Sequence, residues 1–311
     1  MSDLGEKVEK SIKRIKNFKP KDGSGYYLAF SGGKDSVVCK ALLDMAGVKY
    51  DATYRVTSVD PPELVRFIRD KHPDVVREVP RYGSRRGPEW EGKPITMWNI
   101  IPWKMMPPTR LVRYCCDLLK ESGGDGRLIV TGVRWAESIN RERNQGIVTV
   151  MGRSAGREFA NDPNFRQTDR GGVTLNNDNT ETRRIIEHCY KRHKTALNPI
   201  IEWTDEDVWA FIKANGIAYC DLYEEGFTRL GCVGCPMACK HGREKEFARW
   251  PKFLSAYMHA FTAMLAERRI SGKTNGTWAH AEARDVFNWW MEYDVLPGQF
   301  TFDDYEEPEN V

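Results

Sequence analysis

The feature that most constrains the fold is the stretch "YLAFSGGKDSVVCKALL", Tyr27–Leu43. An apolar run, Tyr26–Phe30, leads into the hexapeptide SGGKDS, and a helical pattern follows over Val37–Ala46. Glycines let a backbone bend and approach a ligand closely, and the start of a helix offers free N–H groups with a partial positive charge. A strand, a glycine-rich turn and a helix in this order predict an anion site. The alternative is an ordinary strand–helix turn, which also favours Ser, Gly and Asp.

Strand and helix patterns alternate through the first two thirds of the chain, which predicts a parallel sheet with helices on both faces. The predicted strands are Tyr26–Phe30, Tyr50–Val56, 74–80 and Arg127–Val133. From Arg243 onward the pattern is helical and rich in aromatic residues. We therefore expect a doubly wound, mostly parallel α/β domain over residues 1–225. The Cys-x-x-Cys loop and a C-terminal helical extension would occupy residues 226–311.

One segment, about 141–182, does not fit this α/β pattern. It is rich in Gly, Asn, Asp and Thr, which predicts a long loop inserted into the domain. Its arginines are spaced through it at positions Arg153, Arg157, Arg166 and Arg170. A solvated insertion and a clamp for a substrate or nucleic acid are both consistent with this composition.

Composition places the chain among globular proteins. Of 311 residues, 41% are hydrophobic and 29% charged, and no apolar run approaches the ~18 residues of a membrane helix. The first twenty residues are charged with both signs and lack the apolar core of a secretory signal. We expect a cytoplasmic protein with no membrane partner. A net charge of +3 neither demands nor excludes nucleic acid.

Eight cysteines in such a chain favour metal or redox chemistry over disulfides. Cys232 and Cys235 have the chelating Cys-x-x-Cys spacing, and Cys239 follows four residues later. The adjacent pair Cys115–Cys116 is a poor ligand set for one tetrahedral zinc, since neighbouring side chains point apart, but a cluster with several iron atoms can accept both. Structural zinc and unligated thiols are the alternatives.

Three further polar residues follow predicted strands. Asp60 comes after the second strand, where an acid could hold Mg²⁺ or a ribose, or simply cap the helix that begins near Pro61. Arg134 and Arg141 follow the fourth strand and are candidates for phosphate contacts, with salt bridging as the alternative.

The hexapeptide SGGKDS resembles the signature of the PP-loop ATP pyrophosphatases, which cleave ATP between its α and β phosphates and adenylate an oxygen. Four later motifs appear in the order found in the phosphoadenosine phosphosulfate (PAPS) reductase family of that superfamily: RYCCDLLK, GVRWAESINR, NPIIEWTDEDVWAFI and LYEEGFTRLGCVGCP. The resemblance runs from about Tyr26 to Pro236. It implies an adenine nucleotide alpha hydrolase-like fold.

The resemblance also assigns roles to residues. It implies that ATP is held by the loop residues Ser31, Gly32, Gly33, Lys34, Asp35 and Ser36, with Lys34, Asp35 and Ser36 as catalytic residues. To these we add, from their positions after predicted strands, Asp60 and Arg141 as candidates for binding Mg²⁺ or the nucleotide and Arg134 as a candidate catalytic residue. The resemblance implies a [4Fe–4S] cluster on Cys115, Cys116, Cys232 and Cys235, the arrangement of the family's adenylylsulfate reductases. Cys239 in place of Cys116, or only three thiolates, are the alternatives for the fourth ligand.

Two departures from the reductases bear on function. Their loop is usually degenerate, whereas SGGKDS is intact, and their catalytic cysteine lies on a C-terminal tail, whereas the last cysteine here is Cys239. The resemblance is therefore greatest to the ATP-dependent sulfurtransferases of the DNA phosphorothioation type. It implies that the chain binds an adenine nucleotide and receives sulfur from a cysteine desulfurase. A nucleic acid is one of the acceptors that it allows. The alternatives are a reductase that uses an external thiol and a non-catalytic nucleotide- or nucleic-acid-binding module.

Overall fold

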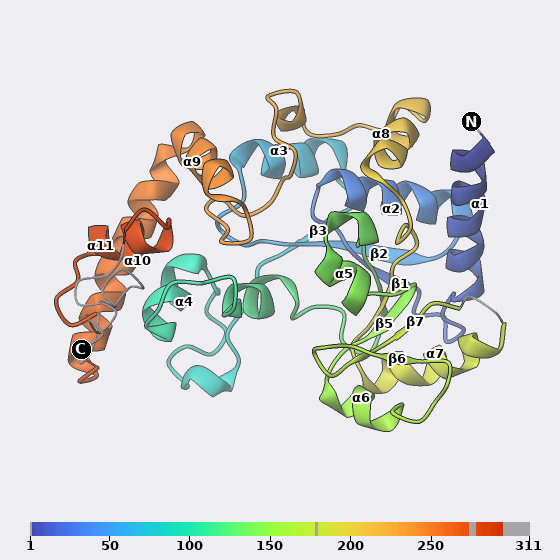
Figure 1. Ribbon diagram of the computed structural model, residues 1–311, viewed down its shortest axis with the longest axis horizontal. Helices are drawn as coiled ribbons and strands as arrows, with labels where there is room; N and C mark the ends of the chain where they lie inside the picture. The colour runs from blue at the N-terminus through green and yellow to red at the C-terminus, as the bar shows by residue number, and fades with distance from the viewer. Residues whose placement is uncertain (1, 178–179, 274–277, 295–311) are drawn as a thin grey trace, which may run out of the picture. The chain divides into compact units, whose positions relative to one another are not determined.

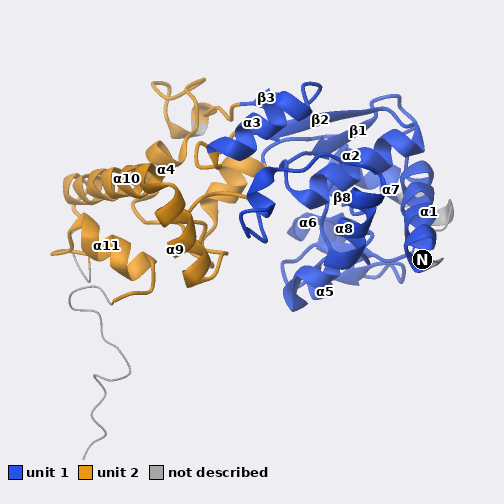
Figure 2. Cartoon of the chain, turned by 90° about the horizontal axis from the view of Figure 1, so that it is seen from above, with its two compact units in different colours: residues 1–55, 62–78, 122–230 blue, residues 56–61, 79–121, 231–311 orange. Residues whose placement is uncertain are grey.

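The computed structural model describes residues 2–177, 180–273 and 278–294. The chain forms two compact units, each assembled from separate stretches of sequence (Figure 2). Unit 1 comprises residues 1–55, 62–78 and 122–230, and unit 2 comprises residues 56–61, 79–121 and 231–311. The change of unit closest to the predicted boundary lies between residues 230 and 231. A division into domains 1–225 and 226–311 stays a prediction.

Among the described residues of unit 1, eight strands form one sheet in the order β3-β2-β1-β4-β8-β5-β7-β6. Their bounds are β1 Tyr26–Ala29, β2 Tyr50–Arg55, β3 Val76–Glu78, β4 Leu128–Val130, β5 Val148–Val150, β6 Arg166–Gln167, β7 Val173–Leu175 and β8 Thr195–Leu197. The central strands β4 and β8 are buried along their whole length. Short, fully buried strands of this kind are typical of a sheet covered on both faces.

The first five strands of that order are parallel, which confirms the predicted mostly parallel sheet. Tyr26 of β1 pairs with Tyr50 of β2, and Leu28 pairs with Val130 of β4 on the other side. The chain thus leaves β1 toward β2 in one direction and returns to place β4 on β1's other edge. The carboxyl ends of β1 and β4 therefore flank a point where the strand order reverses, the usual place of a ligand in such folds.

Helices cover both faces of the sheet (Figure 1). Helices α2 (Lys34–Ala46), α3 (Pro62–Lys71) and α8 (Asp205–Ala214) lie on one face, and α7 (Thr180–Arg192) lies on the other. Helix α1 (Ser2–Asn17) packs against α2. This arrangement confirms the predicted doubly wound fold.

The segment predicted as a long loop has secondary structure of its own. It contains α5 (Ile139–Asn144) and α6 (Arg153–Glu158), and its strands β5, β6 and β7 extend the sheet by antiparallel pairing beyond β8. The expectation of a loop was wrong because β5 and β7 are only three residues long and are surrounded by turn residues. Both are fully buried, so tertiary pairing rather than local pattern defines them.

Unit 2 is mainly helical in its described part, with α4 (Met97–Lys104), α9 (Lys240–Arg249), α10 (Pro251–Ile270) and α11 (Ala283–Trp290). Helix α10 packs on the other three. Its core is aromatic: the Tyr257 ring lies 4.8 Å from Trp290 and 5.8 Å from Phe247, measured between ring centroids. The predicted C-terminal helical extension is confirmed as α9, α10 and α11.

Candidate functional site

The phosphate-type loop predicted from SGGKDS lies between β1 and α2. Gly32 has φ +76°, and a Cβ at this position would come within 2.8 Å of the Ile68 and Leu64 side chains of α3. Only glycine therefore allows this turn to pass so close to α3. Ser31 Oγ accepts from the Gly33 N–H at 3.3 Å, and the Ser36 hydroxyl donates to the Gly33 carbonyl at 2.8 Å.

The N-terminus of α2 points backbone N–H groups into this loop. The N-cap Gly33 supplies no side chain, so helix capping leaves the first N–H groups available to other acceptors. The Lys34 N–H donates to the hydroxyl of Tyr223 at 2.9 Å. The Asp35 N–H has no acceptor among the described residues. An oxyanion placed here would meet free donors and the positive end of the helix dipole.

Arg134 connects this loop to α8. Its side chain is 2% exposed and donates to Asp35 at 2.8 Å, to Asp205 and to the Trp203 carbonyl. Lys34 Nζ lies 3.4 Å from both Asp35 and Asp205. Burial lowers the pKa of Arg134, but the Asp35 and Asp205 carboxylates raise it more, so it stays a cation. Two cations and two carboxylates thus hold one another at the loop.

The remaining predicted nucleotide contacts lie elsewhere. Arg141 is on α5, where it pairs with Glu137 one helical turn earlier. Asp60 belongs to unit 2 and is 8% exposed. The described interactions test neither predicted role, so both assignments stay predictions.

The predicted cluster cysteines all belong to unit 2. Cys115 immediately precedes a π-helical turn, Cys116–Lys120, and Cys232 and Cys235 lie in the turn before α9. The charges of Cys116, Cys232 and Cys235 all act on Cys115, so the four sulfurs share one neighbourhood. Gly234 between them has φ +73°, and a Cβ there would meet Phe247 at 2.6 Å and Trp290 at 3.0 Å. The aromatic core of unit 2 thus fixes the shape of the Cys-x-x-Cys turn.

Two interactions set the protonation of these thiols. The Cys115 thiol donates to the Cys116 sulfur, which raises the pKa of Cys115 and lowers that of Cys116. Burial raises the pKa of Cys232 to about 12, so without a metal it is a thiol at neutral pH. The pKa of Lys120 is raised, first by Cys232 and further by Asp60, against the lowering effect of burial.

Within residues 2–177, 180–273 and 278–294, no group of three or more His, Cys, Asp or Glu side chains could hold a metal ion. The predicted cluster ligands therefore stay a prediction, and the structure lacks the preformed site that a single zinc ion would use. Cys239 is exposed and begins α9, where its sulfur accepts from the Gly242 N–H at 3.3 Å. It shares no recorded interaction with the other four cysteines.

Sequence reasoning missed two residues that contact the loop. Asp205 reads from sequence only as part of a helix start after Thr204, yet its carboxylate pairs with Lys34 and Arg134. Tyr223 lies in the motif LYEEGFTRLGCVGCP, and that motif was the only signal for it. The contact between Tyr223 and Lys34 spans 189 residues of sequence, beyond the reach of any local pattern.

The sheet order, the glycine loop after β1 and the helix that starts on it define an α/β protein of the PP-loop nucleotide-binding class. Residues 25–238 match the family described as "Phosphoadenosine phosphosulfate reductase domain". The chain belongs to the PAPS reductase family, as its motifs predict. In the described residues, no helix has the length and apolar character needed to cross a membrane.

The matches with this chain span less than half the length of the curated relatives. An adenosine 5'-phosphosulfate reductase of Neisseria meningitidis is 45% identical over 53 residues, 17% of this chain and 22% of that protein. An uncharacterised protein of Methanocaldococcus jannaschii is 25% identical over 253 residues, 77% of this chain and 42% of that protein. A PAPS reductase structure from Candida auris has a TM-score of 0.33 at 14% identity, over 67% of this chain and 80% of that one. At these values the structural likeness carries no argument about activity.

Proposed function

We propose that this chain is an ATP-dependent sulfurtransferase that adenylates an acceptor and then transfers sulfur to it. The observation that carries the proposal is the intact loop: the Asp35 N–H at the start of α2 has no acceptor among the described residues, and the Lys34 and Arg134 side chains lie beside it. A sulfonucleotide reductase cleaves no ATP and has no need of a complete pyrophosphate site. The enzyme would work in the cytoplasm, where thiols stay reduced.

In the proposed reaction, an acceptor oxygen attacks the α-phosphorus of ATP and the bond to pyrophosphate breaks. Hydrosulfide then attacks the carbon or phosphorus that carries the activated oxygen, a C–S or P–S bond forms, and AMP leaves with the former acceptor oxygen while a proton is released. The Asp35 backbone N–H and the Lys34 amine would hold the leaving pyrophosphate. Asp35 would orient Arg134 toward the developing charge, and the Ser36 hydroxyl would hold the loop carbonyl of Gly33.

We expect these cysteines of unit 2 to hold an iron–sulfur cluster rather than a single zinc ion, because the adjacent pair Cys115–Cys116 is a poor ligand set for one tetrahedral ion. Cys115, Cys116, Cys232 and Cys235 would hold a [4Fe–4S] cluster, which would supply sulfide in this chemistry. A cysteine desulfurase is the proposed sulfur donor, and Mg²⁺ would accompany ATP. The acceptor would be an oxygen of a nucleic acid or of a small molecule.

The test is pyrophosphate release. Purified protein is incubated anaerobically with ATP and extracts of tRNA, DNA or metabolites, and we expect acceptor-dependent pyrophosphate and AMP. Mass spectrometry of the same pools from cells with and without the protein should show an acceptor in which sulfur replaces oxygen. Ser36→Ala protein serves as the control that lacks a loop hydroxyl, with at least about 100-fold slower release expected.

A second candidate is a sulfonucleotide reductase, favoured by the names of relatives such as the Neisseria enzyme. Sulfite release from adenylylsulfate or PAPS with thioredoxin, without pyrophosphate release from ATP, would establish that activity and refute the sulfurtransferase. Nucleotide binding with neither product would instead indicate a non-catalytic module.

A further inference from the structure

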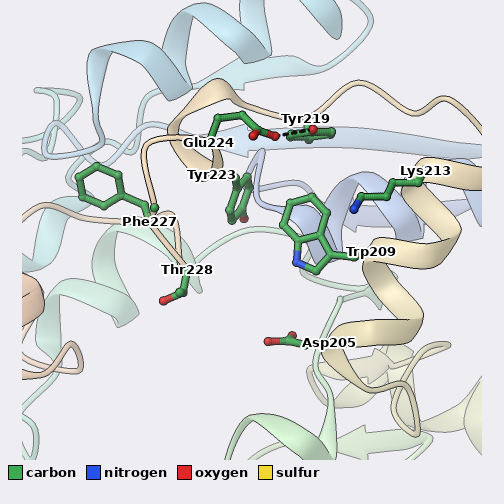
Figure 3. Close-up of a pocket in the computed structure, with 9 residues that line it drawn as sticks. Asp205, Trp209, Lys213, Tyr219, Tyr223, Glu224, Phe227 and Thr228 are labelled. Atoms are coloured by element: carbon green, nitrogen blue, oxygen red, sulfur yellow. Dashed lines mark hydrogen bonds between the residues drawn. The ribbon is translucent and has the colours of Figure 1, made fainter.

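A cavity of about 340 Å³ lies in unit 1, between α8 and the segment that follows it (Figure 3). The motif analysis and the proposed reaction leave it without a role. Its lining residues are Asp205, Trp209, Lys213, Tyr219, Tyr223, Glu224, Gly226, Phe227 and Thr228. All of them lie within positions 205–228 of unit 1, so the cavity is complete within that unit.

Aromatic rings form one wall of this cavity. The Trp209 indole lies edge-to-face against Tyr223 at 5.0 Å and against Tyr219 at 5.2 Å, measured between ring centroids. All three residues are only partly buried. Edge-to-face packing leaves ring faces exposed to the cavity, and Figure 3 shows Trp209 and Tyr223 together beside it. Such a wall favours a flat, unsaturated ligand.

The same cavity borders the phosphate loop through two of its lining residues. The Tyr223 hydroxyl accepts from the Lys34 N–H at 2.9 Å. The Asp205 carboxylate lies 3.4 Å from Lys34 Nζ and pairs with Arg134. A ligand in the cavity would therefore lie next to the groups proposed to hold phosphates.

Several polar groups at the cavity can still donate or accept hydrogen bonds. Trp209 Nε1, the Thr228 hydroxyl and the Lys213 amine have no partner among the described residues. The Glu224 carboxylate accepts from the Tyr219 hydroxyl at 2.6 Å through one oxygen, which leaves the second oxygen as an acceptor. Donors and acceptors at the rim of an aromatic wall suit a planar ring with a polar edge and disfavour a purely apolar group.

We propose that this cavity is a nucleobase site that works together with the phosphate loop. Nucleobases are planar, stack on Trp and Tyr, and carry ring nitrogens and exocyclic groups that match the spare donors and acceptors. The base belongs either to ATP itself or to an acceptor nucleotide. This inference deepens the proposed function and rests on it only for the loop's binding of phosphates.

The experiment measures binding by calorimetry with α,β-methylene ATP, which cannot be cleaved between those phosphates, and with inorganic pyrophosphate. Trp209→Ala removes the stacking surface and should weaken a base-containing ligand about 10-fold or more, within the range for one stacked base. Pyrophosphate affinity should not change. Trp209→Phe should restore most of the loss. Trp289→Ala, at a partly buried tryptophan of unit 2, is the matched control and should change neither affinity.

Two arms identify the source of the base. Weaker binding of α,β-methylene ATP to Trp209→Ala assigns the site to the base of ATP. Unchanged binding of this analogue, with weaker binding of AMP, GMP, CMP or UMP to protein saturated with it, assigns the site to an acceptor nucleotide. No loss in either arm overturns the proposal.

A second variant covers the case in which Trp209→Ala disturbs the loop and lowers pyrophosphate affinity as well. Thr228→Val changes an exposed side chain without a partner and should weaken base binding about fivefold through one lost hydrogen bond. Unchanged base affinity in that variant would then overturn the proposal. Base binding by a wild-type protein that releases no pyrophosphate would refute the proposed function and leave the nucleobase site standing.

Discussion

Arg134 forms ion pairs with two carboxylates at the loop, Asp35 and Asp205. Its guanidinium is buried, whereas the side chains of its partners Asp35 and Asp205 are 21% and 60% exposed. Asp35 lies in the first turn of α2, next to the loop, whereas Asp205 is the first residue of α8. Without Arg134, the two carboxylates would face each other with only the Lys34 amine between them. Arg134 is thus needed for the shape of the loop before any ligand arrives.

Arg134→Ala should lower the free energy of unfolding by about 1 to 3 kcal/mol, less than a fully buried pair would cost because water screens the two carboxylates. It should also weaken pyrophosphate binding. Arg141→Ala is the control, since Arg141 is partly exposed and pairs with Glu137, which ends the 3-10 turn just before α5; its effect should stay within about 0.5 kcal/mol. Urea unfolding and calorimetry measure both, and equal effects of the two substitutions would contradict this account.

The cost of replacing Gly32 by alanine has two parts, one from the positive φ and one from the clash of the new Cβ with α3. Gly32→Ala and Gly47→Ala both place a side chain at positive φ, which costs about 1 to 2 kcal/mol. A Cβ at Gly47 meets nothing within 4 Å, whereas at Gly32 it meets Leu64 and Ile68. Gly32→Ala should therefore destabilise by about 1 to 3 kcal/mol more and displace the loop. Equal unfolding free energies and unchanged pyrophosphate binding would show that α3 does not constrain the loop.

At the scale of elements, the end of α3 is held to the sheet by a histidine. The ring of His72 lies 4.9 Å from Phe30, just after β1, and 5.1 Å from Phe67 of α3. Its buried Nε2 has no hydrogen-bond partner among the described residues. Burial lowers the pKa of His72 and Lys40 adds to this, while Asp74 and Asp44 oppose it. The folded protein therefore keeps this ring neutral.

A lowered pKa in the folded state means that the unfolded chain binds the proton more readily. The contribution of His72 to stability is thus complete above the unfolded pKa of about 6.5 and is lost as the pH falls below it. We expect the free energy of unfolding to drop between pH 7.5 and pH 5, and to drop less in His72→Phe. The exposed His280 serves as the control, and His280→Gln should keep the wild-type slope. Parallel slopes for all three proteins in urea titrations would rule out this role.

At the scale of the whole molecule, metal content tests whether two distant stretches of unit 2, at Cys115–Cys116 and Cys232–Cys235, bind one cluster together. Anaerobically purified protein should be brown and contain about four iron atoms per chain. Cys232→Ser and Cys235→Ser should lose the iron. Cys239→Ser should keep it, because this sulfur caps α9 and serine is a good replacement for a capping residue. Loss of iron from Cys239→Ser with full retention in Cys116→Ser would exchange their roles, and zinc without iron would end the cluster assignment.

In the parallel half of the sheet β8 (Thr195–Leu197) was missed, but strands β1 to β4 were predictable because each belongs to a short strand-like run followed by a helical or turn pattern, as at Tyr26–Phe30. Strands β5 and β7 were not, since three buried residues among turn residues carry no period. At the loop, SGGKDS and Arg134 stood out by motif. Asp205 and Tyr223 did not, because they reach the loop only through contacts across the fold, such as the 71 residues between Arg134 and Asp205.

The interleaving of the two units has a consequence for biosynthesis. The chain changes unit five times, after residues 55, 61, 78, 121 and 230. At about 5–20 residues per second, the ribosome needs roughly 10 to 35 s between making β1 with β2 and completing unit 1. During roughly the first 4 to 15 s of that interval β1 has no β4 beside it, because β4 ends at Val130, and neither unit can finish as an independent block. The nascent chain should therefore depend on holding chaperones, and truncation at any single point should yield no stable half.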